Sequence, residues 1–185
     1  VAKAAMEETV TVLVPVQNPD GRDRFVHHFE MARGPVADAN MDSAEHNEPW
    51  PRGRTNHYLF DLNRDWFAQT QPEIRAHAKA FLEWMPVAFV DAHEMGSDST
   101  YFFAPEAEPY NPFITAEQRA SLIMFGKTNA KRFDHFGIDY FTREVFDAFY
   151  PGYGASWPIY HGAIAMTYEQ ASARGLIATR YDGSQ

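Results

Sequence analysis

The sequence contains no cysteine, which excludes disulfides, thiolate metal ligands and cysteine nucleophiles at once. Basic residues are few: 16 Lys and Arg stand against 25 Asp and Glu, and the formal net charge is −9. Nucleic-acid grooves need clustered Lys and Arg, so this balance argues against nucleic acid as a partner. No apolar run approaches the roughly 18 residues that indicate a membrane span. Any metal site in the chain must therefore use His and carboxylate ligands.

The composition is that of a folded domain. Of the 185 residues, 45% are hydrophobic and 15% are aromatic, which is enough for a sizeable core. There is no internal repeat and no linker that would divide the chain. We therefore predict one domain over residues 1–185. The first residue is Val1 and no signal peptide is visible, so the sequence leaves the compartment open.

Strand-like and helix-like runs alternate along the chain. Apolar or β-branched runs predict strands at residues 9–16, 87–92, 139–142 and 163–168. The second of these runs is nearly continuous, as expected for a strand covered on both faces. Between the first two strands, the NPDG sequence at residues 18–21 predicts a turn, and residues 29–53 predict a long irregular loop.

Two capping boxes predict helix starts, one at Thr70 with Glu73 and one at Thr115 with Gln118. Gly137 is predicted to end the second helix. Strands that alternate with helices predict an α/β fold, with a mixed, mostly parallel twisted sheet flanked by helices. In such sheets the chemistry lies just beyond the carboxyl ends of the strands.

His93 and Glu169 each follow an apolar strand. An imidazole at a strand end is well placed to bind zinc or to act as a base, and the alternative is a His that caps the strand. A carboxylate at a buried strand end tends to have a raised pKa, which suits a general base. The alternative for Glu169 is a structural salt bridge.

Arg54, Asn63 and Arg64 lie in a Gly-led segment before the first predicted helix. Two guanidinium groups and an amide could clamp a carboxylate, whereas the alternative is a solvated basic patch. An aromatic stretch over residues 146–153 indicates a mobile flap with a Tyr hydroxyl at its tip, and the alternative is the packing of a surface loop. The His-x-x-Glu spacing of residues 27–30 could place two ligands on one metal, but without helical support we interpret it as chance.

Taken in order, these motifs resemble those of the zinc metallocarboxypeptidases, the carboxypeptidase A/B-like peptidases. The matching motifs are NPDG at 18–21, Arg54 nine residues before Asn63, DLNR at 61–64, DAH at 91–93 and TYE at 167–169. The resemblance covers nearly the whole chain. It implies a three-layer sandwich and zinc-dependent hydrolysis of the C-terminal bond of a peptide or protein with a free C-terminus.

The resemblance also implies a role for each matching residue. Arg54 would stabilise the oxyanion, and Asn63 with Arg64 would hold the terminal carboxylate of the substrate. Glu169 would be the general base and His93 one zinc ligand. The flap tyrosine would be Tyr150 by spacing, with Tyr153 second. Ala155 lies where specificity is set and offers no charge.

Two departures from the family pattern matter. The family's other zinc ligands come from a His-x-x-Glu motif before the NPDG turn, and no His precedes Asn18. We therefore expect a domain truncated on its N-terminal side, with an exposed apolar sheet edge. This chain alone is expected to bind zinc weakly or not at all, and peptidase activity is expected of the full-length parent. Glu94 follows His93 where classical members have a small hydroxyl residue, which indicates a divergent subfamily.

Two other functions fit the same residues. One is a non-catalytic module that binds peptide C-termini with the same carboxylate clamp. The other is a related zinc amidase that acts on peptidoglycan-type peptides. The family resemblance is compatible with a secreted or periplasmic protein, but the sequence alone does not decide the compartment.

Overall fold

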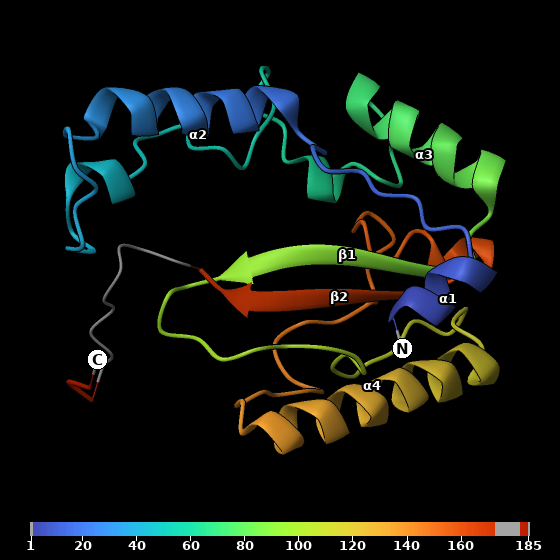
Figure 1. Cartoon of the computed structure of the whole chain (residues 1–185). Helices are drawn as coiled ribbons and strands as arrows, with labels where there is room; N and C mark the ends of the chain where they lie inside the picture. The colour runs from blue at the N-terminus through green and yellow to red at the C-terminus, as the bar shows by residue number, and fades with distance from the viewer. Residues whose placement is uncertain (1, 173–181, 185) are drawn as a thin grey trace.

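A computed structural model describes residues 2–172 and 182–184 of the chain. Its helices and strands follow in the order α1 (Ala2–Glu8), α2 (Pro19–Ala32), α3 (Pro72–Trp84), β1 (Ala88–Met95), α4 (Ala116–Phe136) and β2 (Ile164–Ala171), with short 3-10 turns at Ala44–His46, Leu62–Arg64 and Ile159–His161. The two strands lie between α3 on one side and α4 on the other (Figure 1). No described helix is long and apolar enough to cross a membrane.

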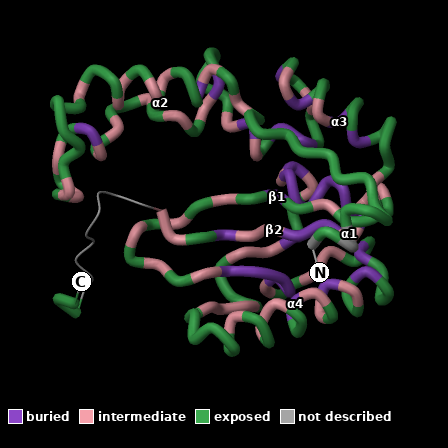
Figure 2. The backbone as a smooth tube through the Cα atoms, in the orientation of Figure 1, coloured by how far each residue is buried: buried purple, intermediate pink, exposed green. Residues whose placement is uncertain are grey.

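β1 and β2 form a parallel pair, in register from Ala88 opposite Ile164 to Met95 opposite Ala171. Side chains alternate between the two faces of the pair. Ala165 of β2 packs in the core on the α3 side, whereas its neighbour Met166 packs against Leu122 on the α4 side. Buried residues concentrate along β2 and the segments beside it (Figure 2). The fold class is therefore α/β with a parallel sheet flanked by helices, as predicted.

An aromatic core holds α3 against the sheet. Trp157 packs on Trp66 and on Phe81 of α3, with ring centroids 5.7 and 5.4 Å apart. Phe89 of β1 meets both Trp66 and Phe81 edge-on. Trp66, Phe81 and Trp157 are at most 5% exposed, so this cluster fixes where β1 and the segment after Leu62 lie.

The second predicted helix forms as expected. The Thr115 side chain accepts a hydrogen bond from the Gln118 amide, the Gln118 side chain reaches back to Thr115, and Gly137 ends α4 with φ +64°. The first predicted helix, α3, begins differently, because the Thr70 hydroxyl donates to the Asp65 carboxylate at 2.6 Å. Asp65 also accepts the amides of residues 70 and 71, so α3 starts without the predicted capping box.

Three strand or turn predictions were wrong. Residues 9–16 form no strand and remain exposed, because an apolar run becomes a strand only where it meets an open sheet edge. Residues 139–142 contribute a single bridge, between Phe141 and Phe102. The NPDG sequence begins α2 instead of a turn: Asn18 caps the Gly21 amide, and Pro19 takes the first helical position. α2 continues to Ala32, into the predicted loop.

β1 is less covered than its apolar run indicates. Val90 is 46% exposed, because α4 packs on β2 and leaves the adjacent face of β1 open. Val87, just before β1, is 78% exposed. Among the described residues, the other edge of β1 has no partner strand. The expected exposed apolar edge is therefore present.

Glu106 is a buried carboxyl group in the segment between β1 and α4. It is 3% exposed, and its Oε2 has no hydrogen-bond partner among the described residues. Burial raises the pKa of Glu106 to about 7. The group is therefore protonated in the folded protein over a pH range in which an ordinary Glu is ionised.

This raised pKa predicts a pH-dependent stability. The contribution of Glu106 to the free energy of unfolding is fully present below pH 4.5, the ordinary pKa of the group. It is lost as the pH rises through the folded-state pKa of about 7. The difference corresponds to about 3 kcal/mol. Glu106→Gln should remove most of this dependence, as measured by denaturant unfolding at about pH 5 and about pH 8. The exposed Glu108 offers the control, since Glu108→Gln should keep the wild-type dependence. A Glu106→Gln variant that also keeps it would contradict the prediction.

Candidate functional site

The register of the two strands brings two predicted site residues side by side. His93 of β1 lies directly opposite Glu169 of β2, and Asp91 lies opposite Thr167. All four occupy alternate positions with Phe89, whose ring packs against Phe81 of α3. The face of the sheet that carries His93 and Glu169 is therefore the α3 face.

His93 sits between a carboxylate and an amide. Its Nε2 atom is 2.9 Å from Asp91 Oδ2 and 3.2 Å from Asn63 Nδ2. Burial disfavours the charged imidazole, but the hydrogen bond and charge of Asp91, with the charge of Glu169, outweigh it and raise the pKa of His93. Asp91, which is 4% exposed, orients the ring through this bond to Nε2. The other ring nitrogen, Nδ1, is then left for a ligand.

Glu169 has the environment of a base. It is 7% exposed, and among the described residues its carboxylate accepts no hydrogen bond, while its backbone pairs with Phe102. Burial raises the pKa of Glu169; the His93 and Arg54 charges reduce this effect, and the Asp91 charge adds to it. A buried carboxylate with a raised pKa and no fixed partner is suited to accept a proton.

Asp61 joins two of the predicted clamp residues. Its Oδ2 accepts from Arg54 Nε at 3.2 Å, and its Oδ1 accepts from the Asn63 backbone amide at 2.9 Å. Thr55 and Asp61 also form a β-bridge, which closes the loop between them. The Asp61 carboxylate therefore holds both Arg54 and Asn63, and this contact was not predicted from the sequence.

Both candidates for the flap tyrosine contact Arg64. The Tyr150 hydroxyl donates to the Arg64 carbonyl at 3.1 Å. The Arg64 guanidinium carbon lies 4.7 Å from the centre of the Tyr153 ring, a cation–π contact. Arg64 also donates to the Asn63 carbonyl at 2.9 Å. Spacing favoured Tyr150, whereas the structure places Tyr153 against the charged group and Tyr150 against the backbone.

Gly154 is a site residue that sequence reasoning missed. Its amide donates to Asn63 Oδ1 at 2.6 Å. A Cβ atom on Gly154 would lie 2.5 Å from Asp91 Oδ2 and 3.0 Å from Trp66 Nε1, so the flap backbone can approach only as glycine. The glycines among the aromatic residues of this loop were the available signal.

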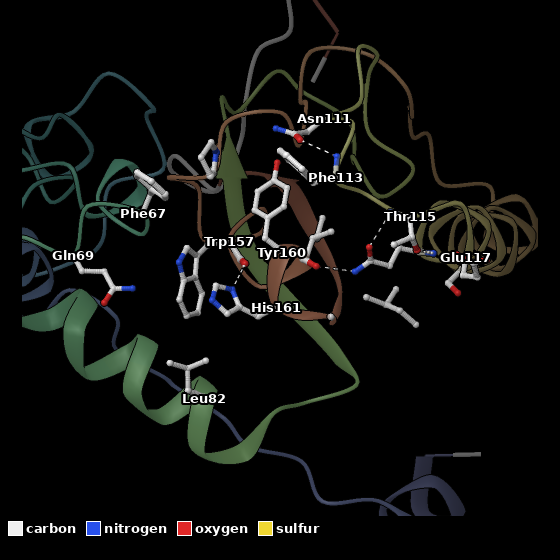
Figure 3. A pocket seen from close by; sticks show the side chains of 16 residues that line it. Phe67, Gln69, Leu82, Asn111, Phe113, Thr115, Glu117, Trp157, Tyr160 and His161 are labelled. Atoms are coloured by element: carbon white, nitrogen blue, oxygen red, sulfur yellow. Dashed lines mark hydrogen bonds between the residues drawn. The ribbon is translucent and has the colours of Figure 1, made fainter.

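Three of the predicted residues line one cavity of about 200 Å³. The predicted residues in it are Arg54, Asn63 and His93, and the lining also includes Asn18, at the start of α2. A larger cavity of about 1120 Å³ contains none of the predicted site residues. It is lined by Phe67, Leu82, Trp157, Tyr160 and His161 among others, and reaches Ile164, the first residue of β2 (Figure 3). The predicted site residues and this larger cavity are therefore separate.

The described residues do not make a zinc site. Within residues 2–172 and 182–184, no group of three or more His, Asp or Glu side chains is placed to hold a metal ion. His93 is the sole residue that the family resemblance marks as a ligand, and a catalytic zinc normally needs three protein ligands. His27 and Glu30 lie on α2, so the expected lack of helical support was wrong, but both are exposed.

No protein-family model matches the chain, and no curated protein matches it. Two solved structures are similar to it. A metallo-carboxypeptidase from Burkholderia cenocepacia is 22% identical, with a TM-score of 0.50 over 85% of this chain and 36% of its own. A protein from Burkholderia mallei ATCC 23344, assigned as a carboxypeptidase, is 18% identical, with a TM-score of 0.51 over 84% and 46%. The chain spans less than half the length of either. At these identities the likeness shows the fold, and it agrees with the family that the motifs resemble.

Proposed function

We propose that this chain carries the part of a carboxypeptidase that binds the C-terminus of a peptide and supplies the general base. The observation that supports this most directly is the shared cavity of Arg54, Asn63 and His93, with Glu169 opposite His93 on the next strand. Arg64 is not among the residues that line this cavity, but its guanidinium donates to the Asn63 carbonyl, and an arginine beside an amide suits a terminal carboxylate. The fold likeness to a metallo-carboxypeptidase supports peptide hydrolysis by the protein to which the chain belongs.

The proposed chemistry uses the residues as they lie. Asn63 and Arg64 would bind the terminal carboxylate, and Arg54 would donate to the carbonyl oxygen of the bound peptide and to the oxyanion that develops from it. Glu169 would accept the proton of the attacking water and pass it to the leaving amine. A metal would need ligands beyond His93, so no step is assigned to one.

A binding module without catalysis is the second candidate. The observation that favours it is that the described residues hold no three-ligand metal group. Such a module would use the same clamp and release the peptide unchanged. The two functions separate when zinc is added to the protein that contains this chain: the peptidase releases the C-terminal residue of a peptide, and the module does not.

Peptide binding tests the clamp that both functions share. We expect the chain to bind a peptide with a free C-terminus about 10- to 100-fold more tightly than the same peptide with a C-terminal amide, because the amide loses charge-assisted hydrogen bonds. Titration calorimetry in EDTA measures this without a metal. Arg64→Ala should remove most of the difference. Arg132→Ala, an exposed arginine on α4, should leave it unchanged. Equal affinity of the wild-type chain for the two peptides would refute the proposal.

A further inference from the structure

The first turns of α2 hold the backbone of the loop that carries Arg54. Arg24, on the second turn of α2, donates from Nη1 to the Arg52 carbonyl at 2.6 Å and to the Thr55 carbonyl at 3.1 Å. Its Nη2 donates to the Asn56 carbonyl at 3.2 Å. One guanidinium group thus binds the loop on both sides of Arg54.

Two more side chains of the same helix start complete the contact. Asn18 Nδ2 donates to the carbonyls of Gly53 and Arg54, at 3.2 and 3.3 Å. Asp20 Oδ2 accepts from the His57 amide at 2.9 Å. Every carbonyl from residue 52 to residue 56 therefore accepts a hydrogen bond from Asn18 or Arg24.

The approach of helix and loop is as close as the backbone allows. Gly21 lies between Asn18 and Arg24 on the same face of α2, because residues three apart on a helix are neighbours. A Cβ atom on Gly21 would collide with the Gly53 carbonyl. The loop thus rests directly on the α2 backbone, and Arg24 binds its carbonyls at residues 52, 55 and 56.

The Arg54 side chain has little else to hold it. It is 47% exposed, and its hydrogen bond to Asp61 involves Nε alone, which leaves the terminal nitrogens for a ligand. The direction in which the guanidinium points therefore depends on the backbone of the loop.

We propose that Arg24 is a positioning residue for Arg54. By binding the carbonyls of residues 52, 55 and 56, it holds the loop so that the Arg54 guanidinium faces the cavity shared with Asn63 and His93. This inference rests on the proposed function, in which Arg54 acts on the bound peptide.

A double-mutant cycle tests the inference in the whole chain. Arg24→Met should weaken binding of the free-terminus peptide about 10-fold, since it removes hydrogen bonds made by a charged group. In the Arg54→Ala background, the same substitution should change the affinity less than about twofold, because residues that act through one another are not additive. Arg24→Lys, which keeps a charged donor, should recover part of the affinity. Arg22→Met is the matched control, because Arg22 is 57% exposed and, within residues 2–172 and 182–184, its side chain bonds only to Asp23.

The outcomes separate the two proposals. If Arg24→Met weakens binding equally with and without Arg54, Arg24 does not act through Arg54 and the inference is overturned. If the wild-type chain does not distinguish free from amidated peptides, the proposed function fails instead. Amide hydrogen exchange then decides the inference: Arg24→Met should speed exchange at Asn56 and Leu59, whose amides close the following turn, and Arg22→Met should not. Wild-type exchange rates in Arg24→Met overturn the inference whatever the peptide measurements show.

Discussion

Replacing Glu169 by Gln is expected to lower peptide hydrolysis about 10²- to 10⁴-fold, the contribution of a positioned general base. Glutamine has nearly the same shape but cannot accept the proton of the attacking water. Because the carboxylate of Glu169 accepts no hydrogen bond among the described residues, the substitution removes no side-chain hydrogen bond from the described fold. Binding of a free-terminus peptide should therefore stay within about twofold of wild type.

The assay for Glu169→Gln measures release of the C-terminal residue by the protein that contains this chain, with zinc in the buffer, and peptide affinity in parallel. Glu94→Gln is the matched control. Glu94 follows His93 on β1 and faces the opposite side of the sheet, where its carboxylate accepts hydrogen bonds from the Gln170 and Ser172 side chains. It should keep wild-type turnover. Near-normal turnover in Glu169→Gln would refute the assignment of the base.

Gly154→Ala is expected to disrupt the site from the flap side. The added methyl group would lie 2.5 Å from Asp91 Oδ2 and 3.2 Å from Asn63 Oδ1. Either the flap moves away, which breaks the 2.6 Å hydrogen bond to Asn63, or Asp91 moves and releases His93. Relieving such an overlap typically costs about 1–3 kcal/mol. We expect peptide affinity to fall by about 10-fold or more.

Gly96→Ala is the control for Gly154→Ala. Gly96 follows the end of β1, and a methyl group there would meet nothing closer than Ser99 Oγ at 4.0 Å. Calorimetric titration with the free-terminus peptide should give wild-type affinity for Gly96→Ala and reduced affinity for Gly154→Ala. Equal affinities in the two variants would show that the flap does not depend on this close approach.

The parts of the fold that sequence predicted well have local causes. The capping box at Thr115 and the left-handed Gly137 fix α4 by bonds within a few residues. The strand over residues 9–16 failed because a strand depends on a distant partner, which the composition of a run does not encode. The capping box at Thr70 failed for a similar reason: Asp65 competes for the same hydroxyl and backbone amides.

The candidate site shows the same division. The spacing of motifs along the chain predicted Arg54, Asn63, His93 and Glu169 as site residues. In the structure the first three line one cavity, and the parallel register places Glu169 opposite His93. Their catalytic and binding roles remain predictions. The support around them was not predictable. Arg24 acts on backbone carbonyls, which every residue has, so no pattern of side chains marks the loop that Arg24 binds.

The open edge of β1 bears on how any of these measurements is made. Within the part of the chain that the structure describes, one edge of β1 is unpaired, and such an edge next to the exposed Val87 and Val90 is a template on which a second chain can pair. The net charge of −9 opposes that pairing by repulsion between copies, and dissolved salt screens the repulsion over about 10 Å at 0.1 M. Low ionic strength and dilute protein therefore favour the dispersed monomer, while concentrated salt favours edge-to-edge aggregates that would mask the peptide-binding signal.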